Sequence, residues 1–177
     1  MNIDHSQKRE NLSRRSFLIN SAAAGGGFAL ALAADIRIAT KSARMNCAFI
    51  KLGLGGCDIG TSYFLPRLVG VSIASELILT GRFIHADRAL AVGLVSEVVA
   101  DGELDNAAAP YLDAMISASP VGLRLSKECI NMAVDAGSIE AVIAMEDRNQ
   151  VLCSRSEDFE EGIRAFVEKR KPVYVTR

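Results

Sequence analysis

The spacing of hydrophobic positions changes along the chain, and each change predicts a different kind of element. Small and apolar residues fill positions 19–34, where a run of glycines leads into a segment with helical spacing. Apolar residues alternate with polar ones over 35–40 and recur over 44–49, which predicts two strands. A glycine-rich loop follows, and then two short helices that end at Gly81 and Gly93. This order of elements predicts an α/β unit.

The final third of the chain has helical spacing throughout. We expect Ser119 to cap a helix and Pro120 to occupy its first turn, where a missing N–H costs nothing. A second helix is predicted over 139–153, and a third begins after Ser156 with acidic residues that favour its N-terminal dipole. Pro110 lies in an earlier helical segment and predicts a kink or a restart there.

Composition and charge exclude several classes of protein. The chain has 177 residues, a formal net charge of -1 and 50% hydrophobic residues, which argues against disorder and against a nucleic-acid partner. The four cysteines form no CxxC pair and there are two histidines, so we expect reduced thiols and no metal. We expect no membrane span, because glycines interrupt the apolar stretch and Asp35 ends it short of the ~20 residues that a bilayer needs.

The beginning of the chain is similar to an export signal. Residues 13–18 read SRRSFL and precede the small, apolar stretch, which resembles a twin-arginine signal peptide. A signal peptidase would accept the small residues Ala31 and Ala33 in such a signal. The alternative is a chance pair of arginines before an apolar segment.

Three later motifs resemble the crotonase (enoyl-CoA hydratase/isomerase) superfamily from about residue 24 onward. They are GGG before LALAADIRIA, LPRLVG before ELILTGR, and the tail SEDFEEGIRAFVEKRKP. The resemblance implies a crotonase-like ββα spiral core over 24–102 that lacks its N-terminal turns. It also implies an all-helical trimerisation region over 103–177, with 1–23 as a leader outside the family.

The same resemblance implies a substrate, an assembly and a location. The substrate would be an acyl-CoA thioester, with coenzyme A as part of the substrate and no other cofactor. The C-terminal helices would form a homotrimer or hexamer, and the protein would be cytoplasmic. Twin-arginine-dependent export is the competing hypothesis, because a cleaved signal would remove the glycines that the crotonase hypothesis needs.

The glycine run is the first candidate site. Backbone N–H groups at a helix start have no partner within the helix, and glycine lets a ligand approach them closely. The run Gly25, Gly26 and Gly27 therefore suits a developing negative oxygen. The resemblance places the Gly26 N–H at the thioester carbonyl as an oxyanion donor, with Ala24 beside the glycines in the substrate site. The alternative is a flexible spacer in a signal peptide.

The second candidate site concerns proton transfer. Family hydratases use two glutamates, and the matching positions hold Ala29 and Phe49, which cannot move a proton although they would line the substrate site. Asp58 matches an acid/base aspartate of dienoyl-CoA isomerases. We predict Asp58 as the catalytic residue, in an apolar pocket of Phe49, Leu54 and Cys57 that would raise its pKa. The alternative is that Asp58 caps the following helix.

These residues together predict an acyl-CoA-binding protein that stabilises a thioester enolate. Isomerisation or another proton transfer is favoured over hydration, because neither glutamate position holds a carboxylate. Two alternatives stay open: a truncated, non-catalytic remnant or partner subunit, and an exported protein with a genuine signal.

Overall fold

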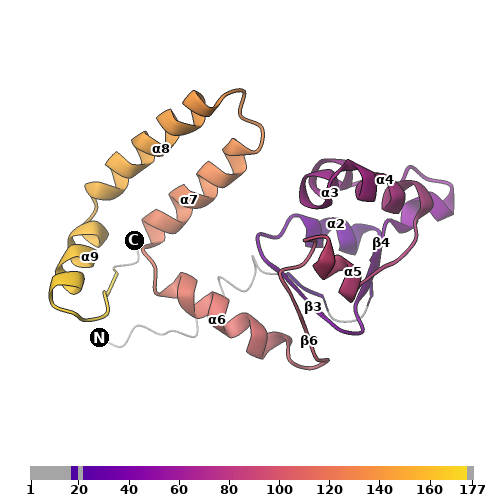
Figure 1. Cartoon of the computed structure of the whole chain (residues 1–177), viewed down its shortest axis with the longest axis horizontal. Helices are drawn as coiled ribbons and strands as arrows, with labels where there is room; N and C mark the ends of the chain where they lie inside the picture. Colours follow the sequence, from indigo (N-terminus) through magenta and orange to yellow (C-terminus); the bar gives the residue numbers. More distant parts are fainter. Residues whose placement is uncertain (1–16, 20–21, 175–177) are drawn as a thin grey trace. The chain divides into compact units, whose positions relative to one another are not determined.

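The structure, a computed structural model, describes residues 17–19 and 22–174 (Figure 1). The chain divides into two compact units after Pro110. This division falls inside a helix that contains Pro110, and the predicted boundary between core and helical region at residues 102 and 103 stays a prediction.

The first unit alternates short strands and helices. In chain order the elements are β1 (Phe17–Ile19), β2 (Ala22–Ala24), α2 (Gly26–Leu32), β3 (Arg37–Thr40), β4 (Arg44–Asn46), the 3-10 helix η1 (Ala48–Leu52), α3 (Thr61–Val69), α4 (Val71–Thr80), β5 (Ile84–His85), α5 (Ala86–Ala91), β6 (Glu97–Val99) and α6 (Leu104–Ile116), which crosses the division. The predicted α/β class is confirmed for this unit.

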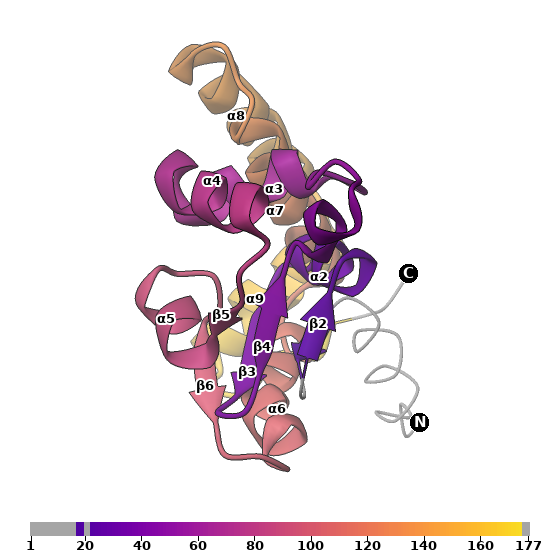
Figure 2. The same cartoon turned by 90° about the vertical axis from the view of Figure 1, so that its right-hand side faces the viewer.

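The strands form two small sheets. One has the order β1-β3-β6 and is parallel, with Leu18 opposite Ile38 and Ile38 opposite Glu97. The other has the order β2-β4-β5, in which β2 and β4 are parallel and β5 is antiparallel to β4. Figure 2 shows β2 beside β4, with α2 beginning where β2 ends. Strand β1 and the first two residues of β2 lie within the predicted leader 1–23, and the two strands pair with β3 and β4.

The predicted strands are longer than the observed ones. Strand β3 begins at Arg37 rather than residue 35, and all four of its residues are buried, so it does not alternate. Burial on both faces is usual for a parallel strand that is covered on both sides. Strand β4 ends at Asn46, and the residues that were expected to extend it to Phe49 enter η1 instead. The helix end predicted at Gly81 is confirmed by its left-handed φ of 57°.

The core of the first unit is built around α2. Its side chains Phe28, Ala31 and Leu32 are each at most 2% exposed, and they join one hydrophobic cluster with buried residues of the strands and other helices. The largest of these partners are Met45, Leu65, Leu77, Ile84 and Leu94. Burial of this area provides most of the stability of such a unit.

A buried arginine links α2 to the strands. Arg37 donates from Nε to the Leu94 carbonyl oxygen at 2.7 Å and from its guanidinium to the carbonyl oxygens of Leu32 and Ala34. Desolvation lowers the pKa of Arg37, and the nearby charge of Asp35 acts in the opposite direction. The charge is therefore held by carbonyl oxygens at the end of α2, where a cation also suits the helix dipole.

The second unit consists of α7 (Pro120–Ala133), α8 (Ile139–Ser154) and α9 (Glu157–Val167). The predicted start of α7 is confirmed, because Ser119 Oγ accepts from the Gly122 N–H at 3.2 Å and Pro120 follows the cap. Ser119 Oγ also donates to the buried Asp158 carboxylate at 2.7 Å, which joins the starts of α7 and α9. Of the kink or restart predicted at Pro110, the restart is wrong, since α6 continues through this residue, and the kink stays a prediction.

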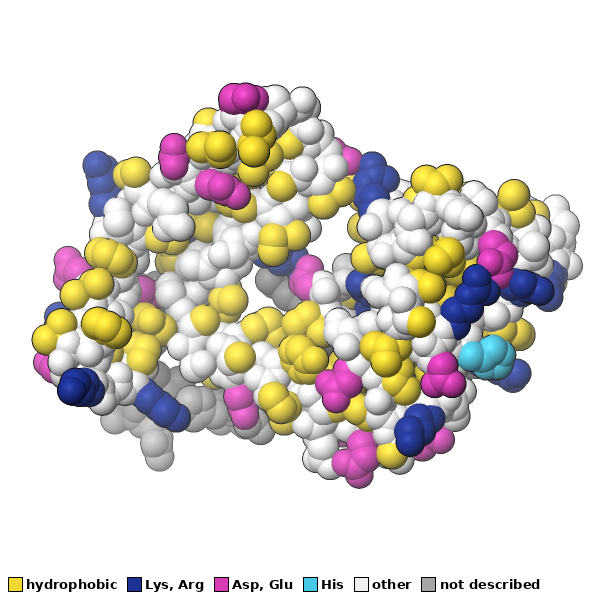
Figure 3. Space-filling model, in the orientation of Figure 1, with side chains coloured by type: hydrophobic (Ala, Val, Ile, Leu, Met, Phe, Trp, Pro, Cys, Tyr) yellow, Lys and Arg dark blue, Asp and Glu magenta, His cyan; other side chains and the backbone are white. Residues whose placement is uncertain are grey.

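Exposed hydrophobic side chains are abundant on the second unit (Figure 3). Examples with more than half of their area exposed are Ile130, Met132, Ile139, Leu152, Ile163, Phe166 and Val167. Surfaces of this kind mark contact sites in soluble proteins.

The four cysteines are free. Of these, Cys47 is buried and Cys57 is exposed.

Replacement of Gly81 by alanine should destabilise the protein more than the same change at Gly53. Both glycines have positive φ, which costs alanine about 1–2 kcal/mol. A Cβ on Gly81 would also stand 2.7 Å from Ile50 Cγ2 and 3.2 Å from the Cys47 carbonyl oxygen, whereas nothing lies within 4 Å at Gly53. We expect Gly81→Ala to lose about 1–3 kcal/mol more in urea unfolding. Equal losses would contradict the close packing at Gly81.

The folded protein should retain residues 17–34. Cleavage after Ala33 would remove β1, β2 and α2, and with them the buried Phe28 and Leu32. We therefore expect intact-mass measurement of folded protein from bacterial cells to show no processing at that position. A cooperatively melting protein that begins at Ala34 would instead support the export hypothesis.

Candidate functional site

The glycine run forms a sharp turn between β2 and α2. Gly25 has φ 54° and ψ -116°, a backbone conformation that a side chain would strain, and it is the N-cap of α2. Its N–H donates to the Asn46 carbonyl oxygen at 3.1 Å, and its own carbonyl oxygen accepts from Ala29 N–H at 3.1 Å. The predicted entry of the glycines into a helix is confirmed.

The amide groups of Gly26 and Gly27 lie at the start of α2. The N–H groups of Gly26 and Gly27 lie in the first turn of α2, where helix geometry provides no acceptor four residues earlier. A Cβ on Gly27 would meet nothing within 4 Å, and one on Gly26 would lie 3.6 Å from Ile59 Cδ1. The space beside the Cα is thus open at Gly27 and has one apolar neighbour at Gly26.

Phe49 lies against the glycine turn. Its ring atoms stand 3.1 to 3.4 Å from the point that a Cβ on Gly25 would occupy, and the residue is partly buried. Ala29, the other position that matches a family glutamate, is 1% exposed in the core. The structure therefore places an aromatic ring at the turn and a methyl group in the core.

The loop after η1 does not enclose Asp58. Leu54 is 58% exposed, and Cys57 and Asp58 are also exposed, so these residues do not form the buried apolar pocket that was expected around Asp58. The Asp58 Oδ1 atom accepts from the Ile59 N–H at 2.9 Å. The carboxylate is thus accessible and oriented by its own loop.

Asp58 is not the N-cap of the next helix. Helix α3 begins at Thr61 with Gly60 as its N-cap, and no side chain accepts a capping hydrogen bond there. The Asp58 carbonyl oxygen instead accepts from Thr61 N–H at 3.0 Å and Thr61 Oγ1 at 2.8 Å. The capping alternative is corrected to a tight turn that comes before the helix.

Two residues near the turn escaped the sequence prediction. Ile59 reaches Gly26, and no sequence signal marks it, since isoleucine is unusual where φ is positive. Asn46 is 4% exposed; its carbonyl oxygen holds Gly25 and its Nδ2 donates to the Gly81 carbonyl oxygen at 3.0 Å. Its Oδ1 is buried without a partner among the described residues. A polar residue at the end of a buried strand was the available signal for Asn46.

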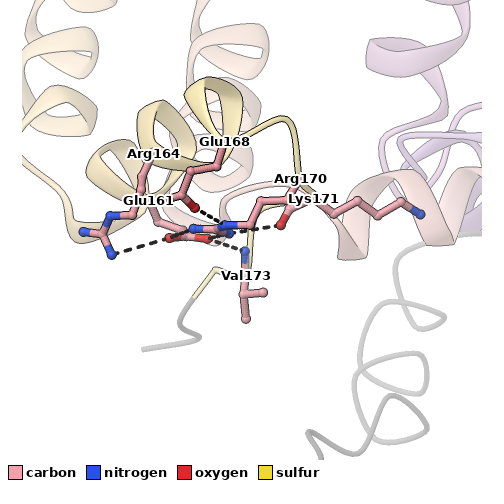
Figure 4. Close-up of polar contacts among 6 residues, drawn as sticks. All are labelled: Glu161, Arg164, Glu168, Arg170, Lys171 and Val173. Atoms are coloured by element: carbon pink, nitrogen blue, oxygen red, sulfur yellow. Dashed lines mark hydrogen bonds and ion pairs between the residues drawn. The ribbon is translucent and has the colours of Figure 1, made fainter.

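Three basic residues near the C-terminus are Arg164, Arg170 and Lys171, and the two arginines form ion pairs (Figure 4). Arg170 donates to both carboxylate oxygens of Glu161, one of them at 3.0 Å, and to Glu168 at 2.6 Å. Glu161 also accepts from the Val173 N–H at 2.9 Å. Arg170 therefore closes the turn after α9, and of these basic residues Lys171 extends away from the cluster.

The described residues contain neither a metal-binding cluster nor a membrane-spanning helix. Over residues 17–19 and 22–174, no group of three or more His, Cys, Asp or Glu side chains is arranged to hold a metal ion. Within the same residues, no helix combines the length and the apolar character that a membrane crossing requires.

Comparison with known proteins identifies the family. The family model for enoyl-CoA hydratase/isomerase matches residues 18–177, six positions earlier than the predicted start at residue 24. The chain is 39% identical over 153 residues to a short-chain-enoyl-CoA hydratase of Clostridium acetobutylicum and 37% identical over 156 residues to a 1,2-epoxyphenylacetyl-CoA isomerase of Escherichia coli. The chain belongs to the enoyl-CoA hydratase/isomerase family, which confirms the predicted crotonase-like fold.

The structural comparison agrees. The fold is similar to the crystal structure of an enoyl-CoA hydratase from Bacillus anthracis, with a TM-score of 0.84, 34% identity, and coverage of 98% of this chain and 71% of that chain. The alignments cover 86% and 88% of this chain but 58% and 59% of the Clostridium and Escherichia proteins. The chain thus spans somewhat more than half the length of these curated relatives.

Acidification should weaken the closed turn after α9. Hydrogen bonds from Arg170 and Val173 lower the pKa of Glu161 to about 2 from its usual 4.5. The ionised group therefore contributes stability that is present above pH 4.5 and is lost as the pH falls toward 2. We expect the difference in Tm between the protein and Glu161→Gln to shrink over this range.

The matched control for this measurement is Glu160→Gln, which removes the charge of a neighbouring exposed carboxylate and leaves the contacts of Glu161 with Arg170 and Val173 in place. A difference for Glu161→Gln that stays constant from pH 5 to pH 2 would contradict the assignment.

Proposed function

We propose that the protein binds an acyl-CoA thioester, stabilises its enolate and moves a proton along the acyl chain rather than adding water. The observation that carries this proposal is the glycine turn, in which the Gly26 amide stands in the first turn of α2 beside Ile59. Family membership supplies the substrate class, since the relatives include proteins named as a hydratase and an isomerase of CoA esters.

The Gly26 N–H is the proposed donor to the thioester oxygen. Removal of a proton next to the carbonyl places negative charge on that oxygen, and a fixed backbone donor stabilises it without reorganisation. A donor of this kind typically contributes about 10²- to 10³-fold to the rate. Gly25 and Gly27 flank the donor, while Ala24, Ala29, Phe49, Leu54 and Cys57 are the proposed neighbours of the substrate.

Hydration is disfavoured by the side chains at the two glutamate positions. Phe49 packs its ring on the turn and Ala29 is buried, so neither position can hold a water by a carboxylate or exchange a proton with it. A protein with this pair needs another group for proton transfer.

Asp58 is the proposed proton-transfer group. Its carboxylate would take a proton from one carbon of the acyl chain and return it to another, so the double bond moves and no co-reactant is consumed. Support comes from its turn, since the adjacent Ile59 reaches Gly26. The exposure of Asp58 means that bound substrate would have to supply the apolar surroundings.

We also propose that copies of the chain associate through the helices of the second unit in a trimer or hexamer, and that the protein works in the cytoplasm. The support for association is the exposed apolar surface there, which includes Ile130, Ile163 and Phe166. The support for the location is that an export signal would lose α2, which carries part of the core, together with β1 and β2, which pair with β3 and β4.

A second candidate function is a non-catalytic partner subunit. The replacement of both glutamate positions by Ala29 and Phe49 favours it, because the exposed apolar helices could serve assembly alone. The two candidates differ in one observable property, which is proton exchange on an acyl-CoA.

Substitution of Asp58 by asparagine should suppress that exchange. We expect the protein to exchange protons of an acyl-CoA for deuterium in heavy water, and Asp58→Asn to reduce the rate about 10²- to 10⁴-fold. The asparagine oxygen can still accept from the Ile59 N–H, so the turn is preserved and the dissociation constant should change little. Mass spectrometry of the recovered ester measures the exchange.

Asp58→Ala is the control for the turn, since it removes both the acid/base group and the hydrogen bond to Ile59. Equal exchange by Asp58→Asn and the unaltered protein would remove Asp58 from the mechanism. Acyl-CoA binding without any exchange by the unaltered protein would favour the partner-subunit candidate.

A further inference from the structure

The loop before α3 ends in a turn whose backbone conflicts with its sequence. The Thr61 N–H donates to the Asp58 carbonyl oxygen at 3.0 Å, and the two residues between them, Ile59 and Gly60, have φ of 49° and 84°. Positive φ at both central positions with this hydrogen bond is the arrangement of a type I′ turn, which favours Asn-Gly. A β-branched residue is unfavourable there, because its Cβ crowds the following carbonyl oxygen.

Burial does not compensate for this conformation. Ile59 is 56% exposed, so its side chain contributes little to the hydrophobic core. The turn is nevertheless held by two further hydrogen bonds, from the Ile59 N–H to Asp58 Oδ1 at 2.9 Å and from Thr61 Oγ1 to the Asp58 carbonyl oxygen at 2.8 Å. An unfavourable residue that adds little to stability points to a role outside folding.

The side chain of Ile59 has one informative neighbour. Its Cδ1 lies 3.6 Å from the position of a Cβ on Gly26, and the Phe49 ring lies 3.1 Å from the corresponding position on Gly25. The side chains of Phe49 and Ile59 thus both pack against the glycine turn and give it an apolar surface. The amide nitrogen of Gly26 is bonded to the same Cα from which a Cβ would project toward Ile59, so a carbonyl group that approaches this N–H comes near the Ile59 side chain.

We propose that Ile59 determines acyl specificity by contacting the carbon next to the thioester carbonyl, and that it excludes acyl groups branched at that carbon. The inference rests on the proposed function, because it takes Gly26 as the donor to the carbonyl oxygen. The site then takes unbranched acyl-CoA thioesters. The unfavourable φ of Ile59 is the cost of holding a branched side chain at this point.

The test compares the dissociation constants of butanoyl-CoA and 2-methylbutanoyl-CoA, measured by calorimetry, in the unaltered protein and in Ile59→Gly. Loss of the side chain should improve the relative affinity for the branched ester about 10-fold, the effect of making room for one methyl group. The Tm should rise by about 2–4 °C, since glycine adopts positive φ freely. Leu79→Ala, which removes a 71% exposed side chain from α4, is the matched control. It should leave the ratio of the two dissociation constants unchanged.

An unchanged ratio in Ile59→Gly, with both esters still bound, would overturn the role of Ile59 and leave the proposed function intact. A lower Tm in Ile59→Gly would also overturn it, because the isoleucine would then be explained by stability. Failure of the unaltered protein to bind either ester would overturn the inference and the proposed function together.

Discussion

The hydrogen bond from the Gly25 N–H to the Asn46 carbonyl oxygen is the contact on which the arrangement of the first unit depends. It fixes the end of β2 to the end of β4, and it sets the direction in which α2 leaves the sheet. The same Asn46 donates through its side chain to the Gly81 carbonyl oxygen, so one buried residue also positions the end of α4. Because both partners at the turn are backbone groups, this geometry tolerates changes in the surrounding side chains.

That tolerance explains how a chain can keep the family fold while its proton-transfer residues change. The positions of Ala29 and Phe49 are determined by α2 and η1, which form whether or not a carboxylate is present. A phenylalanine at the turn even adds packing on Gly25, where a glutamate would have required polar partners. Similarity of fold therefore supports a binding geometry, whereas the type of reaction has to be argued from individual side chains.

The sequence predicted most of this fold because its signals are local. The glycines at 25–27, the Ser119 cap and Gly81 each fix a helix end through their own backbone or side-chain chemistry, and all three are found where they were predicted. The strand over 44–49 was wrong in its second half, since η1 depends on contacts that include the packing of Ile50 against Gly81. Local spacing carries no information about such a distant partner.

The candidate site was predicted less completely for the same physical reason. Gly26 could be chosen from its place at a helix start, but its neighbour Ile59 lies 33 positions away and becomes its neighbour through a turn with positive φ that isoleucine does not favour. Local preference and observed conformation thus disagree at the residue that reaches the glycine turn. Such disagreement is expected where function rather than stability selects a residue. The unfavourable φ of Ile59 and the space around the Cα of Gly27 are the two structural features of this turn that local sequence preference does not account for.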